Sequence, residues 1–272
     1  MEGAWLAVVL GILQGIVEWL PISSEGNLTL ALTALGRSPE VAVQYSLFLH
    51  LGTAAAATAY YRDDLRTIAR GLPDWRPRGA FSGSTAEPSF LAVGTAASVA
   101  VAAVAYLALA AAATALTGGA FVALIGVLLV ATGLIQRVAE PSVVDADRTP
   151  TALDAVLVGG LQGIAVLPGV SRSGVTTSAL LLCGHDGEQS FRLSFLLSIP
   201  AAAGGGVLGI VEAGGIPAVS PLAGVLALLA SVIVGYATIG VLMEIVRRVA
   251  FWGICVGLGT LAIVGGALVV VV

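Results

Sequence analysis

The sequence predicts an all-α polytopic membrane protein with six transmembrane helices and two re-entrant helical hairpins, arranged as an inverted-topology repeat. Three observations predict this class. Apolar residues make up 58% of the 272 residues and charged residues only 10%, against about 25% charged in ordinary soluble chains. Long apolar stretches follow one another along the chain, and polar clusters break two of them. The pattern of the first half also returns in the second half, 148 residues later.

Six apolar stretches are long enough to cross about 30 Å of hydrocarbon as helices, which takes roughly 20 residues. They cover residues 41–61, 89–114, 119–136, 193–214, 221–246 and 250–271. Two further stretches, 4–36 and 151–184, contain Pro, Ser and Gly clusters, and each half of them is too short to span comfortably. We expect each to form two short helices joined at membrane depth, because irregular backbone is tolerated there only when it is buried in protein or lines a wet cavity.

The internal repeat can be followed residue by residue. Gly11-Ile-Leu-Gln-Gly-Ile16 returns as Gly159-Gly-Leu-Gln-Gly-Ile164, and the same offset maps Gly26 onto Gly174. A single integral membrane domain, 1–272, would therefore hold two repeats, about 1–136 and 149–272. Each repeat has one hairpin and three crossings, and an odd number of crossings inverts the second copy relative to the first. The tips of the two hairpins can then meet near the membrane midplane, where broken helices place binding sites.

The arginines predict the orientation. With six crossings, ten arginines fall in loops on one side of the membrane and only Arg37 falls on the other, which is the bias of cytoplasmic loops. We therefore expect a multi-pass protein of the cell (plasma) membrane, with the first hairpin and its site toward the outer face. The ten arginines are Arg62, Arg66, Arg70, Arg76, Arg78, Arg137, Arg148, Arg192, Arg247 and Arg248.

The composition also excludes several functions. All 12 Lys and Arg residues are arginines, so no mechanism can use a catalytic lysine. The sequence contains no run of basic residues of the kind that binds nucleic acid. Cys183 and Cys255 lie in apolar stretches and are expected to be packing residues. The first 20 residues contain Gln14 and Glu18 and lack a basic start, so we do not interpret them as a cleaved signal peptide.

An acid and an amide stand together in the first broken stretch. Gln14 and Glu18 are four residues apart and share one face of a helix. A carboxylate at membrane depth needs a cation, a metal ion or water beside it. Glu18 is therefore expected either in a site or, as the plainer alternative, in a structural ion pair with Arg172.

Polar clusters precede the second half-helix of each broken stretch. Arg172 offers a planar fork of donors suited to phosphate oxygens, and Ser171, Ser173 and Gly174 surround it. Ser23, Ser24, Glu25 and Gly26 occupy the matching place in the first stretch. Each serine alone would be a helix cap, but two helix N-termini converging beside one arginine predict a pocket for a multiply charged anion such as diphosphate.

The residues carry a resemblance to a known family. Gln14-Gly-Ile-Val-Glu18-Trp-Leu-Pro-Ile-Ser-Ser24-Glu-Gly26 resembles the first signature of the undecaprenyl-diphosphate phosphatase (bacitracin-resistance) family. Pro168-Gly-Val-Ser-Arg-Ser-Gly-Val-Thr176 is similar to the second, which is highly specific, and Phe195-Leu-Leu-Ser-Ile-Pro200 to a third. The resemblance extends over nearly the whole chain.

The resemblance implies a membrane-embedded hydrolase that converts a polyprenyl diphosphate to the monophosphate for lipid-carrier recycling. It also implies an outward-facing site, a divalent metal ion (Mg²⁺ or Ca²⁺) and a homodimer. By position, Ser24 would be the nucleophile or its immediate orienter, Arg172 the phosphate clamp, and Glu18 with Gln14 the metal ligand or base. The rest of the substrate site would be formed by Ser23, Gly26, Asn27, Ser171, Ser173, Gly174 and Thr176.

One position departs from the family pattern. Asn27 stands where the family has histidine, and an asparagine cannot accept a proton at working pH. Glu25, which replaces a neutral threonine, is then a substitute base or an additional metal ligand. Otherwise Glu18 alone transfers the proton, or phosphatase activity is reduced or lost.

A second class of function fits the same architecture. Inverted repeats with helices broken at the midplane are typical of secondary transporters, so a carrier or flippase for polyprenyl phosphate or a small anion is the alternative. A lipid phosphatase with a nucleophilic histidine fits poorly, because neither His50 nor His185 lies in a suitable motif. His50 is expected to be a packing or interhelical hydrogen-bonding residue, and His185, Asp186 and Glu188 to cap a helix.

Overall fold

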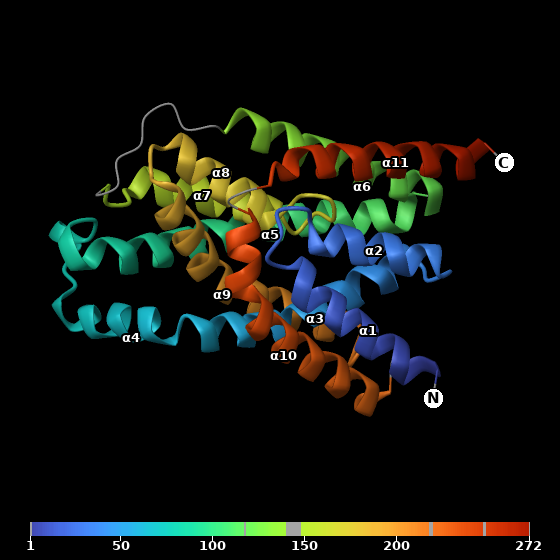
Figure 1. The fold of residues 1–272 in the computed structure, drawn as a ribbon, viewed down its shortest axis with the longest axis horizontal. Helices are drawn as coiled ribbons and strands as arrows, with labels where there is room; N and C mark the ends of the chain where they lie inside the picture. Colours follow the sequence, from blue (N-terminus) through green and yellow to red (C-terminus); the bar gives the residue numbers. More distant parts are fainter. Residues whose placement is uncertain (1, 117, 140–147, 218–219, 247–248, 272) are drawn as a thin grey trace.

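The computed structural model describes residues 2–116, 118–139, 148–217, 220–246 and 249–271, and these form an all-helical protein (Figure 1). The all-α prediction is thereby confirmed for the described residues. Three short 3₁₀ turns lie between the fourth and fifth helices. The helices are α1 (Glu2–Val17), α2 (Ser24–Ala34), α3 (Pro39–Tyr60), α4 (Arg62–Gly71), α5 (Ala86–Ala115), α6 (Gly118–Val138), α7 (Ala152–Ile164), α8 (Arg172–Leu182), α9 (Gly187–Glu212), α10 (Pro221–Val246) and α11 (Phe251–Val271).

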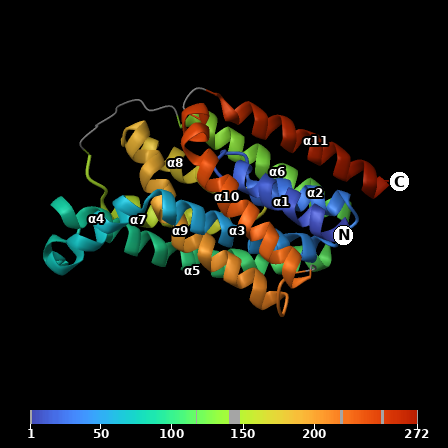
Figure 2. The same ribbon diagram turned by 60° about the horizontal axis from the view of Figure 1, so that its bottom comes forward.

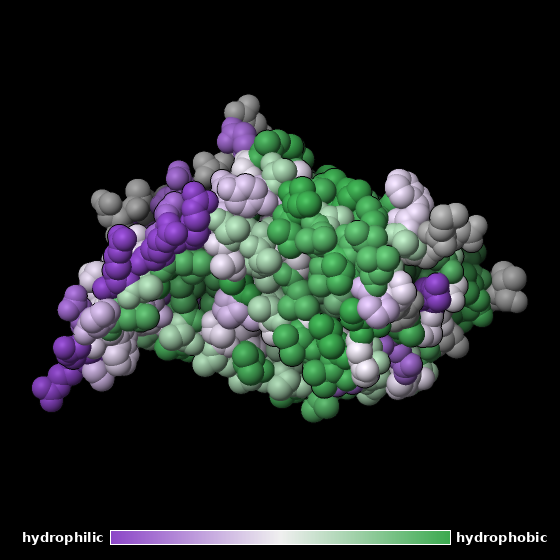
Figure 3. Space-filling model, turned by 90° about the horizontal axis from the view of Figure 1, so that it is seen from below, coloured by the Kyte–Doolittle hydropathy of each residue, from purple (hydrophilic) through white to green (hydrophobic). Residues whose placement is uncertain are grey.

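Five helices are long and apolar enough to cross a membrane, namely α5, α6, α9, α10 and α11. They correspond to five of the six predicted spans. The sixth, 41–61, forms the 22-residue helix α3, but Gln44, Ser46 and His50 lower its hydropathy. Figure 3 shows a largely apolar face with hydrophilic side chains gathered at the end where α4 lies. The chain is thus a multi-pass membrane protein.

Both interrupted stretches are broken where the sequence predicts. The first divides into α1 and α2, joined by residues 18–23, and the second into α7 and α8, joined by residues 165–171. We call these connections the first and second site loops. Ser23 caps α2 by accepting from the Gly26 N–H, and Ser171 caps α8 by accepting from the Gly174 N–H. The two breaks therefore share the same capping chemistry at positions related by the repeat.

The helices pair in a pattern that does not change when the two halves are exchanged. α1 packs along α10 and α7 packs along α5, while α3 lies beside α9 and α6 beside α11 (Figure 2). Glycines permit the first two contacts: a Cβ on Gly15 would lie 2.8 Å from the Gly235 N, and one on Gly163 would lie 2.6 Å from the Ser98 O. Each first half-helix is thus packed against the opposite half of the chain.

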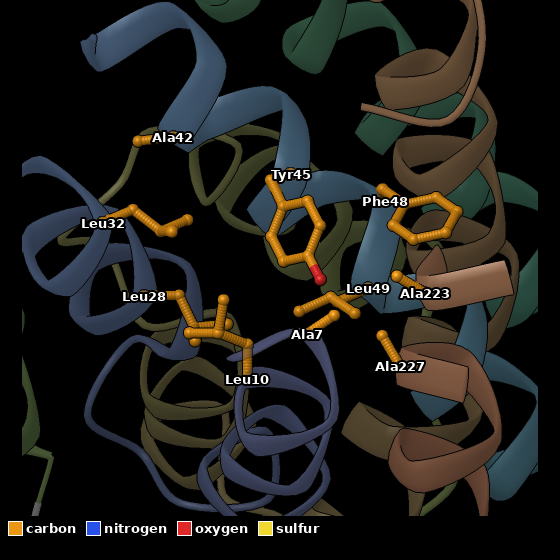
Figure 4. Close-up of a cluster of buried hydrophobic side chains, with 10 residues drawn as sticks. All are labelled: Ala7, Leu10, Leu28, Leu32, Ala42, Tyr45, Phe48, Leu49, Ala223 and Ala227. Atoms are coloured by element: carbon orange, nitrogen blue, oxygen red, sulfur yellow. The ribbon is translucent and has the colours of Figure 1, made fainter. Parts of the chain in front are cut away.

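An apolar cluster fixes the first broken stretch in place (Figure 4). Side chains of α1 and α2 meet α3 and α10 there, with Phe48 and Leu49 fully buried. Between membrane helices such contacts stabilise by close packing rather than by removal from water. Its remaining members are Ala7, Leu10, Leu28, Leu32, Ala42, Tyr45, Ala223 and Ala227.

The connection between the first and second predicted spans contains regular structure. It contains the amphipathic helix α4, whose Asp64 is bound by Arg192 of α9. Arg192 also makes two hydrogen bonds to Glu87 of α5, at 2.7 and 3.0 Å. The exposed arginines of α4 remain on the outside of this contact. Arg247, Arg248 and residues 140–147 of the predicted cytoplasmic loops lie outside the described residues.

Candidate active site

The two site loops are in direct contact. The Ser23 hydroxyl accepts hydrogen bonds from the Gly26 N–H at 3.2 Å and from the Gly169 N–H at 3.0 Å. A Cβ on Gly26 would lie 2.6 Å from the Gly169 N, so only glycine permits this approach. Ser23 itself has φ 61°, a left-handed conformation that costs a non-glycine residue of order 1–3 kcal/mol and is typical of functional sites. The loops lie near the middle of the molecule in Figure 1.

Glu18 is the centre of the hydrogen-bond network. Its Oε2 accepts from the Ser24 hydroxyl at 2.6 Å and from Gln14 Nε2 at 2.9 Å. Its Oε1 is bound by Arg172 Nη2 across the two loops. Gln14 and Glu18 therefore share a face as predicted, and the ion pair with Arg172 that was the plainer alternative is present. The residue is only 5% exposed, so the charge of its carboxylate is balanced by these partners.

Arg172 has donors to spare. Its Nη1 is buried and has no hydrogen-bond partner, although Nη2 binds Glu18. The guanidinium lies over the Phe195 ring, 5.4 Å from its centroid. A buried cationic donor without a partner is costly, and an anion would satisfy it. The ion pair alone therefore does not account for this side chain.

Side chains around Arg172 hold its backbone. Thr176 donates to the Arg172 carbonyl at 2.8 Å and lies 2.6 Å from the Ser194 hydroxyl. Ser173 donates to the Leu20 carbonyl of the first site loop at 3.3 Å. Thr176 and Ser173 thus join the helix bearing Arg172 to its neighbours. The structure places Thr176 as a support of Arg172.

His50 also lies in this cluster, where it makes a polar contact between helices of the kind expected for it from the sequence. Its Nε2 lies 3.4 Å from Glu18 Oε2, and its Nδ1 lies 2.9 Å from the carbonyl O of Ser46. The side chain lines the same cavity as Ser24 and Arg172. The signal in the sequence was an ionisable residue in the middle of a membrane helix, which marks a functional position by default.

Glu25 and Asn27 occupy different surroundings. Glu25 is 6% exposed, lines the cavity and has Oε1 buried without a hydrogen-bond partner. Asn27 donates from Nδ2 to the carbonyl O atoms of Ile22 and Ser23, at 2.7 and 2.9 Å. Asn27 therefore holds the backbone of the first site loop.

Two cavities meet at these side chains. A polar one of about 20 Å³ is lined by both site loops together with Glu18 and His50. A larger, mainly apolar one of about 560 Å³ extends between α3, α5, α7 and α9. Glu25, His50 and Arg172 line both. A charged group at these residues would thus adjoin apolar space large enough for a hydrocarbon chain.

Several oxygen atoms in this region are of the kind that ligate a hard divalent cation. Such ions prefer carboxylate and carbonyl oxygens, and Mg²⁺ commonly uses one or two carboxylates together with substrate phosphates. Glu18 and Glu25 both line the polar cavity, and the Oε1 atoms of Glu25 and Gln14 are buried acceptors without partners. Among the described residues no group of three His, Cys, Asp or Glu side chains is arranged to hold a metal ion.

Fold and site together define a class: a multi-pass helical membrane protein in which two broken helices meet at a buried carboxylate, hydroxyl and guanidinium. The model of the family described as bacitracin resistance protein BacA matches residues 7–263 of the chain. The chain therefore belongs to this family.

Curated relatives agree over nearly the full length. A protein of Haloarcula marismortui named undecaprenyl-diphosphatase is 52% identical over 270 residues, covering 99% of both chains. Proteins of the same name from Methanococcoides burtonii and Geobacter sulfurreducens are each 37% identical, over 267 and 252 residues. The first covers 94% of this chain and 96% of its own, and the second 90% and 91%. The resemblance inferred from the two signatures is thus confirmed.

Proposed function

We propose that this protein is a membrane-embedded phosphatase that hydrolyses a polyprenyl diphosphate to the monophosphate and inorganic phosphate. The observation that carries the proposal is the chain of contacts Ser24–Glu18–Arg172, with Arg172 Nη1 left free. It provides a hydroxyl, an acceptor for its proton and a cation for phosphate in one buried place. The names of the full-length relatives support the same substrate class.

The hydroxyl and the carboxylate serve the attack. Ser24 Oγ donates its hydrogen to Glu18 Oε2 at 2.6 Å, so Glu18 takes the proton when an oxygen nucleophile attacks the terminal phosphorus. That nucleophile is a water that Ser24 orients, or Ser24 Oγ itself, in which case a water then hydrolyses the phosphoserine, releasing inorganic phosphate and restoring the hydroxyl. The bond from phosphorus to the bridging oxygen breaks, and the polyprenyl monophosphate leaves. In this arrangement Glu18 fills the proton-accepting role that Asn27 cannot.

The cation and the helix ends hold the phosphate. The free Arg172 Nη1 binds a non-bridging oxygen, and the N-termini of α2 and α8 add positive potential. Phosphoryl transfer depends mainly on such positioning and charge neutralisation. A Mg²⁺ or Ca²⁺ ion, when bound, supplies further charge neutralisation, and Glu25, Glu18 and the side-chain carbonyl of Gln14 are the groups that would hold it. The lipid chain would occupy the cavity of about 560 Å³.

The membrane arrangement belongs to the same proposal. We infer six crossings with α3 included, and two re-entrant hairpins formed by α1–α2 and α7–α8. The pairing of helices stays the same when the two halves of the chain are exchanged, and this supports inverted repeats. The excess of arginines on one side supports a site open to the outer face of the plasma membrane. The homodimer that the resemblance implies remains part of the proposal.

Phosphate release from a C55 polyprenyl diphosphate by purified protein tests the function. We expect metal-dependent release that falls about 10²–10³-fold in Arg172→Ala, the size of effect seen when a transition-state donor is removed. Ser24→Ala should lose activity similarly, whereas Arg172→Lys should restore only part, because lysine lacks the planar fork.

The carrier alternative predicts a different result. It requires folded protein that binds the lipid and releases no phosphate under any metal condition. If wild-type protein binds the lipid but releases no phosphate, the phosphatase function is refuted, and the broken helices are then interpreted as a transport site.

A further inference from the structure

Helix α6 carries two polar side chains, Thr132 and Gln136, in a segment that is otherwise apolar up to Arg137 in its last turn. Thr132 and Gln136 are four residues apart, so they lie on the same face. Thr132 is 1% exposed. Polar groups in membrane helices are expensive unless neighbouring elements satisfy them, so their partners indicate what they are for.

Thr132 brackets the second site loop. Its hydroxyl donates to the Gly169 carbonyl at 3.1 Å and accepts from the Ser171 N–H at 3.3 Å. These two backbone groups closely precede Arg172. Gly169 has φ 103°, so the chain turns sharply there. One hydroxyl therefore fixes both sides of the turn that presents the guanidinium.

Gln136 holds the first site loop in the same way. Its Nε2 donates to the Pro21 carbonyl at 2.6 Å, and the Cys255 thiol of α11 donates to the same oxygen at 3.1 Å. Pro21 lies between Glu18 and Ser24. Gln136 also approaches the second stretch, because a Cβ on Gly174 would lie 2.6 Å from its Nε2.

These bonds differ from ordinary contacts between membrane helices. Thr238 of α10 also bonds to another helix, donating to the Gly15 carbonyl at 3.1 Å, but Gly15 belongs to the regular helix α1. The partners of Thr132 and Gln136 are backbone groups of unwound loops. α6 is thus one rigid element that bonds to both site loops.

We propose that Thr132 and Gln136 are positioning residues that set the separation of the Ser24 hydroxyl from the Arg172 guanidinium, a claim that rests on the phosphatase function proposed above. Neither residue lines the polar cavity, so they act through the loops. A misplacement of about 1 Å in an active site lowers the rate by roughly 10²-fold. Loss of these bonds should therefore lower kcat while the lipid chain still binds.

The kinetic test uses matched threonine variants. Thr132→Val keeps the shape and removes the hydroxyl, and we expect kcat for C55 diphosphate to fall about 10–100-fold with KM nearly unchanged. Thr132→Ser keeps the hydroxyl and should retain most activity. Thr238→Val removes an interhelical bond of similar length and should leave kcat within about threefold, because surrounding helix geometry is retained. Equal losses in Thr132→Val and Thr238→Val would overturn the proposal.

Backbone hydrogen exchange provides a readout that does not need activity. Thr132→Val should speed exchange in residues 165–171, and Gln136→Met should speed it in residues 18–23, each without affecting α10. Faster exchange throughout the protein, or unchanged exchange in both loops, would refute the positioning role. If the wild type releases no phosphate, the proposed function fails, whereas the exchange pattern still decides whether α6 holds the loops.

Discussion

At the scale of single residues, the site is organised around one carboxylate whose four neighbours come from different parts of the chain. Gln14 and Ser24 are near in sequence, whereas His50 and Arg172 reach Glu18 from α3 and α8. Because each partner either donates to or faces the same two oxygens, a change in one alters the position of the carboxylate for the others. Single substitutions here are therefore expected to be strongly non-additive.

His50 is expected to orient Glu18 for its part in catalysis. Replacing it in His50→Leu removes the polar contact between His50 Nε2 and Glu18 Oε2 at 3.4 Å. We expect kcat to fall about tenfold, because the carboxylate is then less well placed and a misplacement of about 1 Å costs roughly 10²-fold. Initial rates of phosphate release measure this. Thr58→Val on the same helix, where the hydroxyl bonds only to Ala54, serves as control and should match wild type.

Glu25 is expected to act through the metal ion. Its Oε1 is buried without a partner, and the residue lines the polar cavity. Glu25→Gln should therefore raise the Mg²⁺ concentration for half-maximal activity by about tenfold, as loss of a carboxylate ligand weakens a hard-cation site. A titration of rate against Mg²⁺ at saturating lipid measures the shift. Unchanged activity and unchanged metal dependence would exclude Glu25 both as ligand and as substitute base.

At the scale of elements, the important feature is that two broken helices approach more closely than side chains allow. A Cβ on Gly26 would lie 2.6 Å from the Gly169 N, and one on Gly174 would lie 2.6 Å from Gln136 Nε2. Glycine at position 26 is a requirement of the approach of the two loops, whereas glycine at position 174 makes room for the Gln136 side chain of α6. The Ser23 and Ser171 caps then begin both second half-helices at the site.

Gly26→Ala tests this close approach. The added methyl must push against backbone of the second site loop, so the loops separate and kcat should fall about 10²-fold for a displacement near 1 Å. Gly257→Ala in α11 adds the same methyl in open space and should be neutral or slightly stabilising, because alanine favours helix. Thermal unfolding in detergent, measured beside kcat, separates a displaced site from an unfolded protein. Wild-type kcat in Gly26→Ala would contradict the account.

Sequence patterns predicted the helices and their breaks better than which face of each membrane helix points toward the site. The two breaks, the shared face of Gln14 and Glu18, and the meeting of Glu18 with Arg172 could all be inferred from local spacing and the repeat. Thr132 and Gln136 could not be assigned to the site, and His50 carried only the general signal of an ionisable residue within a membrane helix. In a soluble helix an apolar stripe identifies the buried face, but a helix in lipid is apolar all round, so its rotation is undetermined until its neighbours are known.

At the scale of the whole molecule, the helix pairing is the same when the two halves of the chain are exchanged. The contact of α1 with α10 corresponds to the contact of α7 with α5. The pairs α3–α9 and α6–α11 each join helices that occupy equivalent places in the two halves. The chemistry is not repeated: Ser24 and Arg172 occupy equivalent first positions of α2 and α8. A duplicated scaffold thus carries one site with a different functional group from each half.

The proposed orientation can be measured on intact cells. In a background of Cys183→Ala and Cys255→Ser, Arg37→Cys should react with a membrane-impermeant maleimide, because it lies on the outer side. Arg70→Cys in α4 should react only after permeabilisation. The arginine distribution is the physical reason. Labelling of Arg70→Cys in sealed cells would reverse the orientation and place the site toward the cytoplasm.

The swapped packing of the half-helices has a consequence for biogenesis. As the chain emerges from the ribosome, α1 enters the membrane long before α10, the helix against which it packs, has been synthesised. Glu18 likewise has no Arg172 beside it until α8 has been synthesised. Until α8 has been synthesised, the segment α1–α2 holds a carboxylate without its cationic partner. A carboxylate at membrane depth is costly without one, so a ribosome-bound intermediate that ends before α8 is expected to stay in contact with the insertion machinery.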